Sequence, residues 1–226
     1  MEAFALVALA PDAHAANKDD NAAGNPFLGG LAFAPATTDV TVGDTVTWTN
    51  TDFLVPHTAT EDHGLFRLGG TFGPPVTAVG GFAPGEKVSR AFDAGTFHYF
   101  CEIHPVQMRG VVAAAMRLSS KPVTRTRVVK KKPRGRKGKR KRRISKRGSE
   151  ITAVWGTVPL PADQVFDVQM KQGGDWKTVR DGVSQLSGAF DGGKPGTTSS
   201  FRARVRRDTD PSSSSDWSPV AAITAG

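Results

Sequence analysis

The stretch Ala94–Met108, AGTFHYFCEIHPVQM, contains the single cysteine of the chain and decides how the whole sequence is interpreted. Cys101 is followed by His104 and Met108 with the spacing C-x2-H-x3-M, and a second imidazole, His57, lies upstream in the sequence VPHT. One thiolate, two imidazoles and a weak axial thioether form the ligand set of a trigonal blue-copper site. Sulfur suits Cu(I) and imidazole suits Cu(II), so such a site holds copper in both oxidation states.

The residues around these four candidate ligands follow the two-residue period of strands. Phe97, Tyr99 and Cys101 lie on one face of the predicted strand, so Cys101 is presented from the core side. Apolar and polar residues also alternate within residues 40–48, on both sides of a turn predicted at the Gly-Asp pair in the middle. Residues 109–113 predict a closing strand, and the glycines and prolines between 69 and 81 predict loops and short edge strands.

In these residues the chain resembles a cupredoxin of the plastocyanin and azurin kind, over residues 26–118. The resemblance implies a Greek-key β-sandwich that holds one type 1 copper ion. It implies the ligands His57, Cys101 and His104 in the trigonal plane, with Met108 as the axial ligand.

Four other residues bear on this interpretation. Thr58 stands where plastocyanins and azurins often have Asn, which puts the outer-shell hydrogen bond to the thiolate in question. His98 is three residues before Cys101 and should point away from the copper face of the strand. His63, in a Gly-bounded loop, is expected in solvent, and His14 falls in a segment that we expect to be removed.

The function implied by the resemblance is that of an exported blue copper protein that carries single electrons between redox protein partners. No H-x-H pair, Ser-His-Asp set or paired carboxylates stand out, so we do not expect an enzyme. The alternative is an envelope-associated adhesion or scaffold protein in which copper is structural, stored or sensed. A copper chaperone is a third hypothesis, and the same four ligands tolerate tetrahedral zinc.

Charge is distributed very unevenly along the 226 residues, although the net charge is only +9. Residues 1–118 carry 6 Lys/Arg and 12 Asp/Glu, residues 119–150 carry 16 against 1, and the remainder carries 8 of each. The basic segment has no hydrophobic period and repels itself, which predicts a disordered linker. Three roles are open for this segment: a solvated spacer, a tether of residues 121–147 to an anionic surface or polymer, or a contact with the acidic copper domain. We do not expect nucleic acid as its partner.

The first residues hint at export. The apolar run FALVALA is followed by Ala13-His14-Ala15, an A-x-A cleavage pattern, but Glu2 stands where a basic residue is usual. The alternatives are a truncated signal peptide over residues 1–15 and an ordinary apolar strand. We expect the former, processing near Ala15, and an extracytoplasmic protein that is secreted, periplasmic or attached to the cell envelope. No run is long enough to span a membrane.

Residues 150–226 predict a second all-β unit, with strands at 151–155, 165–171 and 201–206 and a hairpin turn at the sequence GGD. This unit resembles a fibronectin type III domain in which Trp155 is the core Trp, although Ser199 stands at the expected corner Tyr. Arg side chains in the last of these strands could form a ladder stacked on Trp217. The predicted fold class is therefore all-β. The predicted segments are residues 1–15 (signal peptide), 26–118 (copper domain), 119–149 (flexible linker) and 150–226 (second sandwich).

Overall fold

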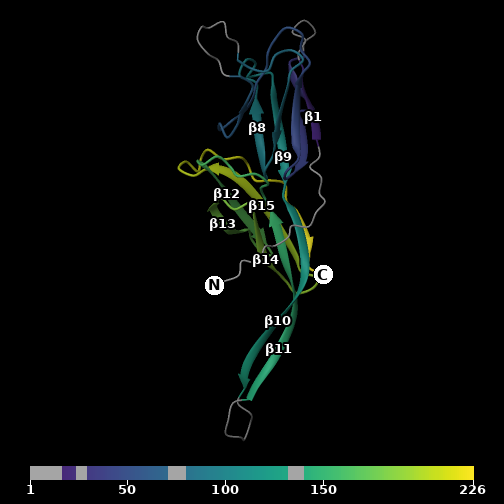
Figure 1. Cartoon of the computed structure of the whole chain (residues 1–226), viewed down its shortest axis with the longest axis vertical. Helices are drawn as coiled ribbons and strands as arrows, with labels where there is room; N and C mark the ends of the chain where they lie inside the picture. The colour runs from purple at the N-terminus through teal and green to yellow at the C-terminus, as the bar shows by residue number, and fades with distance from the viewer. Residues whose placement is uncertain (1–16, 24–29, 71–79, 132–139) are drawn as a thin grey trace, which may run out of the picture.

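The computed structural model describes residues 17–23, 30–70, 80–131 and 140–226, and every element in these ranges is a β-strand. Two β-sandwiches follow one another along the long axis, and a two-stranded ribbon extends from the far end of the second (Figure 1). Among the described residues there is no helix with the length and apolar character needed to cross a membrane. The predicted all-β fold class is confirmed, whereas the predicted signal peptide lies outside the described residues.

The first sandwich consists of two sheets. One sheet has the order β2 (Ala32–Ala34), β1 (Asn17–Ala23), β4 (Thr45–Asn50) and β7 (Lys87–Ala91). The other has the order β3 (Thr37–Thr41), β9 (Arg109–Ala115), β8 (Gly95–Phe100), β5 (Ala59–Glu61) and β6 (Arg67–Leu68). The sandwich therefore begins at Asn17, before the boundary predicted at residue 26. The polar sequence NKDDNAA of β1 has no apolar period, and its strand is specified by parallel pairing with β4.

The alternation predicted in β4 and β8 is confirmed. In β4, Val46 and Trp48 are fully buried while the three threonines that alternate with them are partly exposed, and Phe97 and Tyr99 of β8 face the same core. Trp48 and Tyr99 meet edge to face with ring centroids 5.5 Å apart. Gly43 has a φ of 91° at the predicted turn, which leads from one sheet to the other because β3 and β4 belong to different sheets. This turn is thus a corner of the sandwich.

The second sandwich also has two sheets. The first contains β10 (Arg117–Lys131), β11 (Arg140–Val154) and β14 (Ser187–Gly193). The second has the order β13 (Lys177–Val183), β12 (Gln164–Lys171), β15 (Thr198–Arg207) and β16 (Ala221–Thr224). Trp155 is fully buried, as predicted for the core Trp. The fibronectin type III resemblance itself stays a prediction.

The basic segment differs from the prediction of a disordered linker. β10 and β11 pair antiparallel in one continuous register, from Arg117 opposite Val154 to Lys131 opposite Arg140. The prediction counted charge repulsion but not two features that favour strands: β10 is rich in Val and Thr, and alternation places successive side chains on opposite faces. The base of the hairpin is also part of the second sandwich, which fixes the register before the most basic residues begin.

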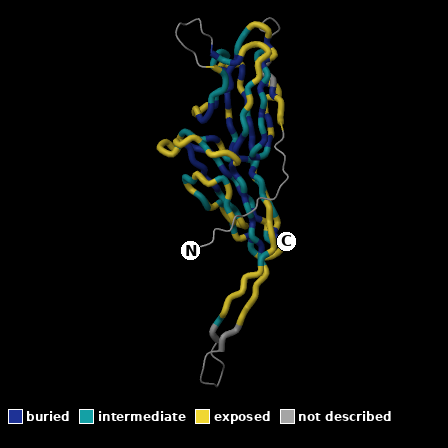
Figure 2. Tube along the Cα trace, in the orientation of Figure 1, coloured by how far each residue is buried: buried dark blue, intermediate teal, exposed yellow. Residues whose placement is uncertain are grey.

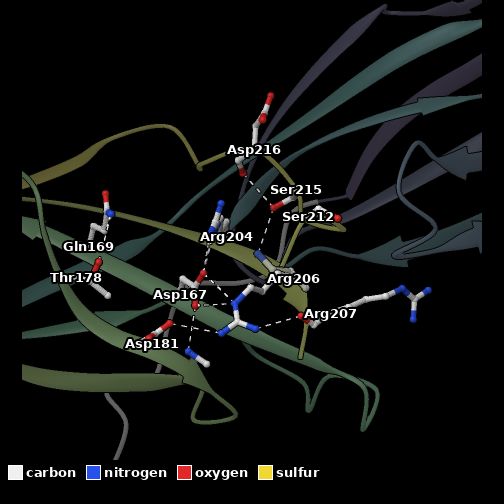
Figure 3. Close-up of polar contacts among 12 residues, drawn as sticks. Asp167, Gln169, Thr178, Asp181, Arg204, Arg206, Arg207, Ser212, Ser215 and Asp216 are labelled. Carbon is white, nitrogen blue, oxygen red and sulfur yellow. Dashed lines mark hydrogen bonds and ion pairs between the residues drawn. The ribbon is translucent and has the colours of Figure 1, made fainter. Parts of the chain in front are cut away.

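The predicted Arg ladder is present on the outer face of the second sandwich. The Arg202 guanidinium lies between Trp176 and Trp217, at 4.5 Å and 4.8 Å from their ring centroids, and Arg204 lies 4.8 Å from the Trp217 ring. Figure 3 shows that Arg204 and Arg206 converge on Asp167, and their Nε atoms donate to this carboxylate at 3.0 and 3.1 Å. These arginines are therefore fixed in place rather than simply exposed.

The two sandwiches are joined by hydrogen bonds, several of them between backbone groups. The amide of Ala94 donates to the carbonyl of Trp155 at 2.8 Å, and the Asp93 carboxylate accepts from the Thr157 amide at 3.0 Å. Thr96 of β8 exchanges two backbone hydrogen bonds with Asp216, at 3.0 and 2.9 Å. The strand that leads to Cys101 is thus attached directly to the second sandwich.

Asp93 makes this junction sensitive to pH, because burial raises the pKa of its carboxyl to about 6. The unfolded chain ionises near pH 3.8 and the folded one near 6, so stability is lost as the pH rises through this range. In metal-free protein, Asp93→Asn should gain free energy of unfolding relative to wild type between pH 4 and pH 7, by up to about 3 kcal/mol. Denaturant titrations at both pH values measure this difference. Asp175→Asn, at an exposed position, is the control, and a pH-independent effect of Asp93→Asn would contradict the assignment.

Candidate metal centre

His57 is held in the β4–β5 loop by its own backbone. Its amide donates to the carbonyl of Phe82 at 3.1 Å, and the amide of Phe82 donates back to the carbonyl of His57 at 2.8 Å. Gly81, with a φ of 121°, lies so close that an added Cβ would be 2.6 Å from the carbonyl oxygen of His57. The imidazole is fully buried. Its position is therefore set by a bridge that tolerates no side chain at residue 81.

The loop from Cys101 to Met108 closes on itself through three backbone hydrogen bonds. The amide of Cys101 donates to the carbonyl of Met108 at 3.0 Å, and the amide of His104 donates to the carbonyl of Cys101 at 3.1 Å. The amide of Met108 donates to the carbonyl of His104 at 3.0 Å. Cys101 and Met108 are fully buried, while His104 is half-buried. The predicted ligand loop is thus a compact turn with its two sulfur residues inside.

The sulfur and the two imidazoles meet at one point. The Nδ1 atoms of His57 and His104 lie 3.7 and 3.8 Å from Cys101 Sγ, and all three donor atoms fall within 4.8 Å of one another. Metal–donor bonds of about 2.0–2.3 Å place the donors of a trigonal or tetrahedral shell about 3.3–3.8 Å apart. The spacing therefore fits a metal ion. In the part of the chain that the structure describes, this is the one cluster of His, Cys and acidic side chains so arranged.

Sequence analysis put the hydrogen bond to the Cys101 sulfur in question, because Thr58 stands where related proteins often have Asn. This hydrogen bond comes from the backbone. The amide of Thr58 donates to Cys101 Sγ at 3.4 Å, so it does not depend on the side chain at this position. The Thr58 hydroxyl accepts instead from the amide of Glu102 at 2.8 Å. Thr58 therefore connects the loop of His57 to the loop of Cys101 through two contacts, one with the sulfur of Cys101 and one with the amide of the next residue.

An ion pair behind the cysteine reinforces this connection. Glu102 receives two hydrogen bonds of 2.8 Å from the Arg67 guanidinium and one of 2.8 Å from the Thr60 hydroxyl. Hydrogen bonding from Arg67 in particular holds the pKa of the Glu102 carboxyl below its usual value. Arg67 also donates to the carbonyls of Gly69 and Gly70 at 2.8 Å. Bidentate pairs of this kind fix orientation as well as charge.

Asp52, which sequence analysis missed, lies on the far side of His57. Its Oδ2 is 3.5 Å from His57 Nε2, both side chains are fully buried, and neither atom has a hydrogen-bond partner among the described residues. Burial acts to raise the pKa of Asp52, but the backbone amides of Leu54 and Phe53 outweigh it and the pKa is lowered. The carboxylate thus favours a proton on Nε2 and leaves Nδ1 free to bind metal.

Burial also keeps the imidazoles neutral. It is the largest cause of the lowered pKa of His57, followed by the neighbouring His104, and burial likewise lowers the pKa of His104. Neutral imidazole is the form that binds metals. Of the other histidines, His98 is half exposed and lies 3.2 Å from Asp216, and His63 is half exposed beside Glu61, so both predictions of an outward position are confirmed. His14 lies outside the described residues.

A second missed feature anchors the strand that carries the cysteine. The Tyr99 hydroxyl donates to the buried carboxylate of Asp20 at 2.7 Å and accepts from Trp48 Nε1 at 3.1 Å. Gly110, opposite Tyr99 in β9, leaves room for this ring, because an added Cβ would be 2.4 Å from the Tyr99 hydroxyl. Asp20 gave no sequence signal because β1 has no apolar period.

Apolar side chains are exposed near the half-buried His104. Val106 is 81% exposed and Pro105 is exposed, while Pro56 is only partly exposed. Phe53 and Leu54, which follow Asp52 directly, are 61% and 59% exposed and were not predicted. The residues next to the candidate ligands therefore include several that leave apolar surface in water.

Comparisons with known proteins concern this first half of the chain. Residues 25–115 match the family of copper binding proteins described as the plastocyanin/azurin family. Chloroplastic plastocyanin of Tetradesmus obliquus is 38% identical over 103 residues, which cover 45% of this chain and 68% of that protein. Plastocyanin of Scenedesmus fuscus is 36% identical over 86 residues, which cover 37% of this chain and 87% of that protein.

Solved structures give similar matches. A purple cupredoxin from Nitrosopumilus maritimus is 22% identical, with a TM-score of 0.33, covering 43% of this chain and 98% of that one. Pseudoazurin from Hyphomicrobium denitrificans is 22% identical, with a TM-score of 0.32, covering 44% of this chain and 75% of that one.

The contact between Asp52 and His57 generates a prediction. Asp52→Asn removes the negative charge behind Nε2 but keeps an oxygen for the Leu54 amide, so affinity for copper should fall about 10- to 100-fold. Competition with a chelator of known affinity measures the change. Asp39→Asn, which removes the same charge from an exposed position of this sandwich, should leave the affinity unaltered. Equal affinities of the two variants would show that Asp52 does not support the site.

Proposed function

Because this chain belongs to the plastocyanin/azurin family of copper-binding proteins, we propose that it is an exported type 1 copper protein that carries single electrons between redox protein partners. The observation that supports this most is the convergence of Cys101 Sγ and two imidazole Nδ1 atoms, 3.7 and 3.8 Å away, in a buried site. When bound, copper supplies a one-electron couple between Cu(I) and Cu(II).

We propose His57, Cys101 and His104 as the trigonal ligands and Met108 as the axial ligand. Met108 is fully buried. Its backbone is hydrogen-bonded to the backbones of both Cys101 and His104, so the three residues belong to one closed loop. A thiolate with a weak axial thioether is the soft part of the type 1 ligand set. Zinc is expected to fit the same donors in a preparation that contains it.

The bonds around the site support a role in electron transfer. The amide of Thr58 donates a hydrogen bond to Cys101 Sγ, and backbone hydrogen bonds close the loop from Cys101 to Met108. The Arg67 guanidinium holds the Glu102 carboxylate in place. These contacts do not involve the metal, so they should persist when its charge changes. A cage that barely moves between two oxidation states requires little reorganisation for each electron.

We infer that electrons leave through His104. It is the half-buried one of the two imidazoles, and it follows the thiolate by three residues, whereas His57 is fully buried. Pro105, Val106, Phe53 and Leu54 supply exposed apolar surface on the loops that carry the two histidines. Such a surface loses water readily when a partner docks, which suits a brief encounter that brings the imidazole edge close to the partner.

An extracytoplasmic location remains part of this proposal, because copper ligation of the single cysteine removes the objection to a free thiol in an oxidising compartment. We expect an anionic surface or polymer to contact residues 121–147, and we expect neither nucleic acid as a partner nor catalysis. The alternative, an adhesion or scaffold protein with structural, stored or sensed copper, is favoured by the second sandwich and ribbon, which lie outside the matched residues 25–115.

The visible spectrum tests the ligand set. Addition of Cu(II) should produce an intense thiolate-to-copper band that a mild reductant bleaches and an oxidant restores. Cys101→Ser should abolish the band because serine offers no thiolate, while Met116→Leu, at a buried position in the same core, should retain it. A protein that stays colourless with Cu(II) would leave the adhesion or scaffold function as the better proposal.

The apolar surface beside His104 generates a separate prediction. Val106→Asp introduces a charge that must lose water on docking, and it should slow electron self-exchange on the order of tenfold, equivalent to about 1.4 kcal/mol. NMR line broadening in mixtures of oxidised and reduced protein measures the rate. Val220→Asp, at a 57% exposed site of the second sandwich, is the matched control. If both variants exchange electrons equally fast, the surface around Val106 has no part in docking.

A further inference from the structure

The ribbon formed by the distal parts of β10 and β11 extends past the second sandwich. β11 pairs with β14 only from Ser149 to Val154, and none of the described strands adds a third partner between residues 123 and 148. Figures 1 and 2 show this ribbon as the lower end of the molecule, with most of its described residues exposed. A two-stranded ribbon without a covering layer is marginally stable by itself, which raises the question of what it contacts.

The register places cations on both faces of the ribbon. Arg125 is opposite Lys146 and Arg127 is opposite Ile144, so these three cations share one face. Arg143 is opposite Val128 and Arg147 is opposite Thr124, on the other face. Like charges directly opposite each other, as at Arg125 and Lys146, destabilise a strand pair. This arrangement weakens the hairpin unless an anion lies between the charges.

Carboxylates neutralise only the base of the ribbon. Lys121 pairs with Glu150 at 2.7 Å and Arg125 with Asp191 at 2.5 Å. Further out, no ion pair with a described residue involves the four cations Arg127, Arg143, Lys146 and Arg147. All four side chains are exposed. These four side chains are therefore available to an external anion.

We propose that this ribbon binds a flexible, linear phosphate polymer. A planar bilayer could contact only one face at a time, whereas a flexible chain can follow cations on both. Arg offers bidentate donors that match phosphate. Residues 117–154 contain no aromatic side chain to stack on bases and no Asn or Gln to read the edge of adenine, so the ribbon recognises the phosphates of the polymer and not bases.

The same geometry orients the bound protein. β8, which ends immediately before Cys101, points towards the end of the molecule opposite the ribbon (Figure 1). The two sandwiches between these ends are joined by the hydrogen bonds at Asp93, Ala94 and Thr96. A polymer held by the ribbon therefore leaves the surface around His104 free. This inference does not depend on electron transfer as the function.

The experiment measures binding of the full chain to poly(glycerol phosphate) by fluorescence anisotropy of the labelled polymer, across a series of salt concentrations. The triple variant Arg127→Gln, Arg143→Gln, Arg147→Gln should bind roughly 100-fold more weakly at low salt. Its slope of log K against log salt should be shallower by about 2. The control Lys87→Gln, Lys177→Gln, Lys194→Gln removes the same charge from exposed positions outside the ribbon and should bind like wild type.

A second variant separates charge from folding. Arg127→Lys, Arg143→Lys, Arg147→Lys keeps the charge and should keep the salt slope, with a smaller loss of affinity from the missing bidentate contacts. Equal weakening by the ribbon and control variants, or no binding by wild type, would overturn the proposal. Tighter binding per phosphate to anionic phospholipid vesicles or to duplex DNA would overturn the assigned partner class. A colourless copper site with intact polymer binding would refute only the electron-carrier function.

Discussion

The closed turn from Cys101 to Met108 is the constraint on which the rest of the site depends. It brings the Cys101 sulfur and the His104 imidazole together through hydrogen bonds between backbone groups of the same turn. Thr58 then ties this turn to the loop of His57, with its amide on the sulfur and its hydroxyl on the next amide of the turn. Two segments 44 residues apart in sequence therefore behave as one unit, and loss of the bond to the sulfur would leave the buried amide of Thr58 without this partner.

The surroundings of this unit favour the neutral form of its two imidazoles. Burial lowers the pKa of both imidazoles, and the Asp52 carboxylate favours a proton on the outer nitrogen of His57. The Cys101 sulfur is buried and accepts a hydrogen bond from the Thr58 amide at 3.4 Å. The protein thus presents two neutral imidazoles to a cation in a largely buried site, where a lower effective dielectric strengthens their interaction with it.

Much of this could be predicted from sequence, because the relevant signals are local. The spacing of Cys101, His104 and Met108, the alternation in β4 and β8, and the outward position of His98 all follow from residues that are close together in the chain. The remainder depends on pairing between distant segments. The hydrogen bond to the Cys101 sulfur is donated by the backbone amide of Thr58. Any residue except Pro has such an amide, so the sequence carries no signal for it. Asp20 and Asp52 acquire their roles only when Tyr99 and His57 lie against them. The prediction of a disordered linker was wrong, because the sequence indicates the charge repulsion within the basic segment but not the pairing of β10 with β11.

The connection between β9 and the ribbon has a mechanical consequence. Only Met116 separates the end of β9 from the start of β10, and this residue is buried. Tension on a tethered ribbon would therefore pass into β9 without a slack linker. β9 is bonded along its length to β8 on one side and to β3 on the other, so this load would act in shear across many hydrogen bonds at once. Strands loaded in this way resist separation better than strands peeled apart one bond at a time. The molecule is built so that a pull on its anchor is borne by the sheet, while the turn that holds Cys101 lies beyond the loaded bonds.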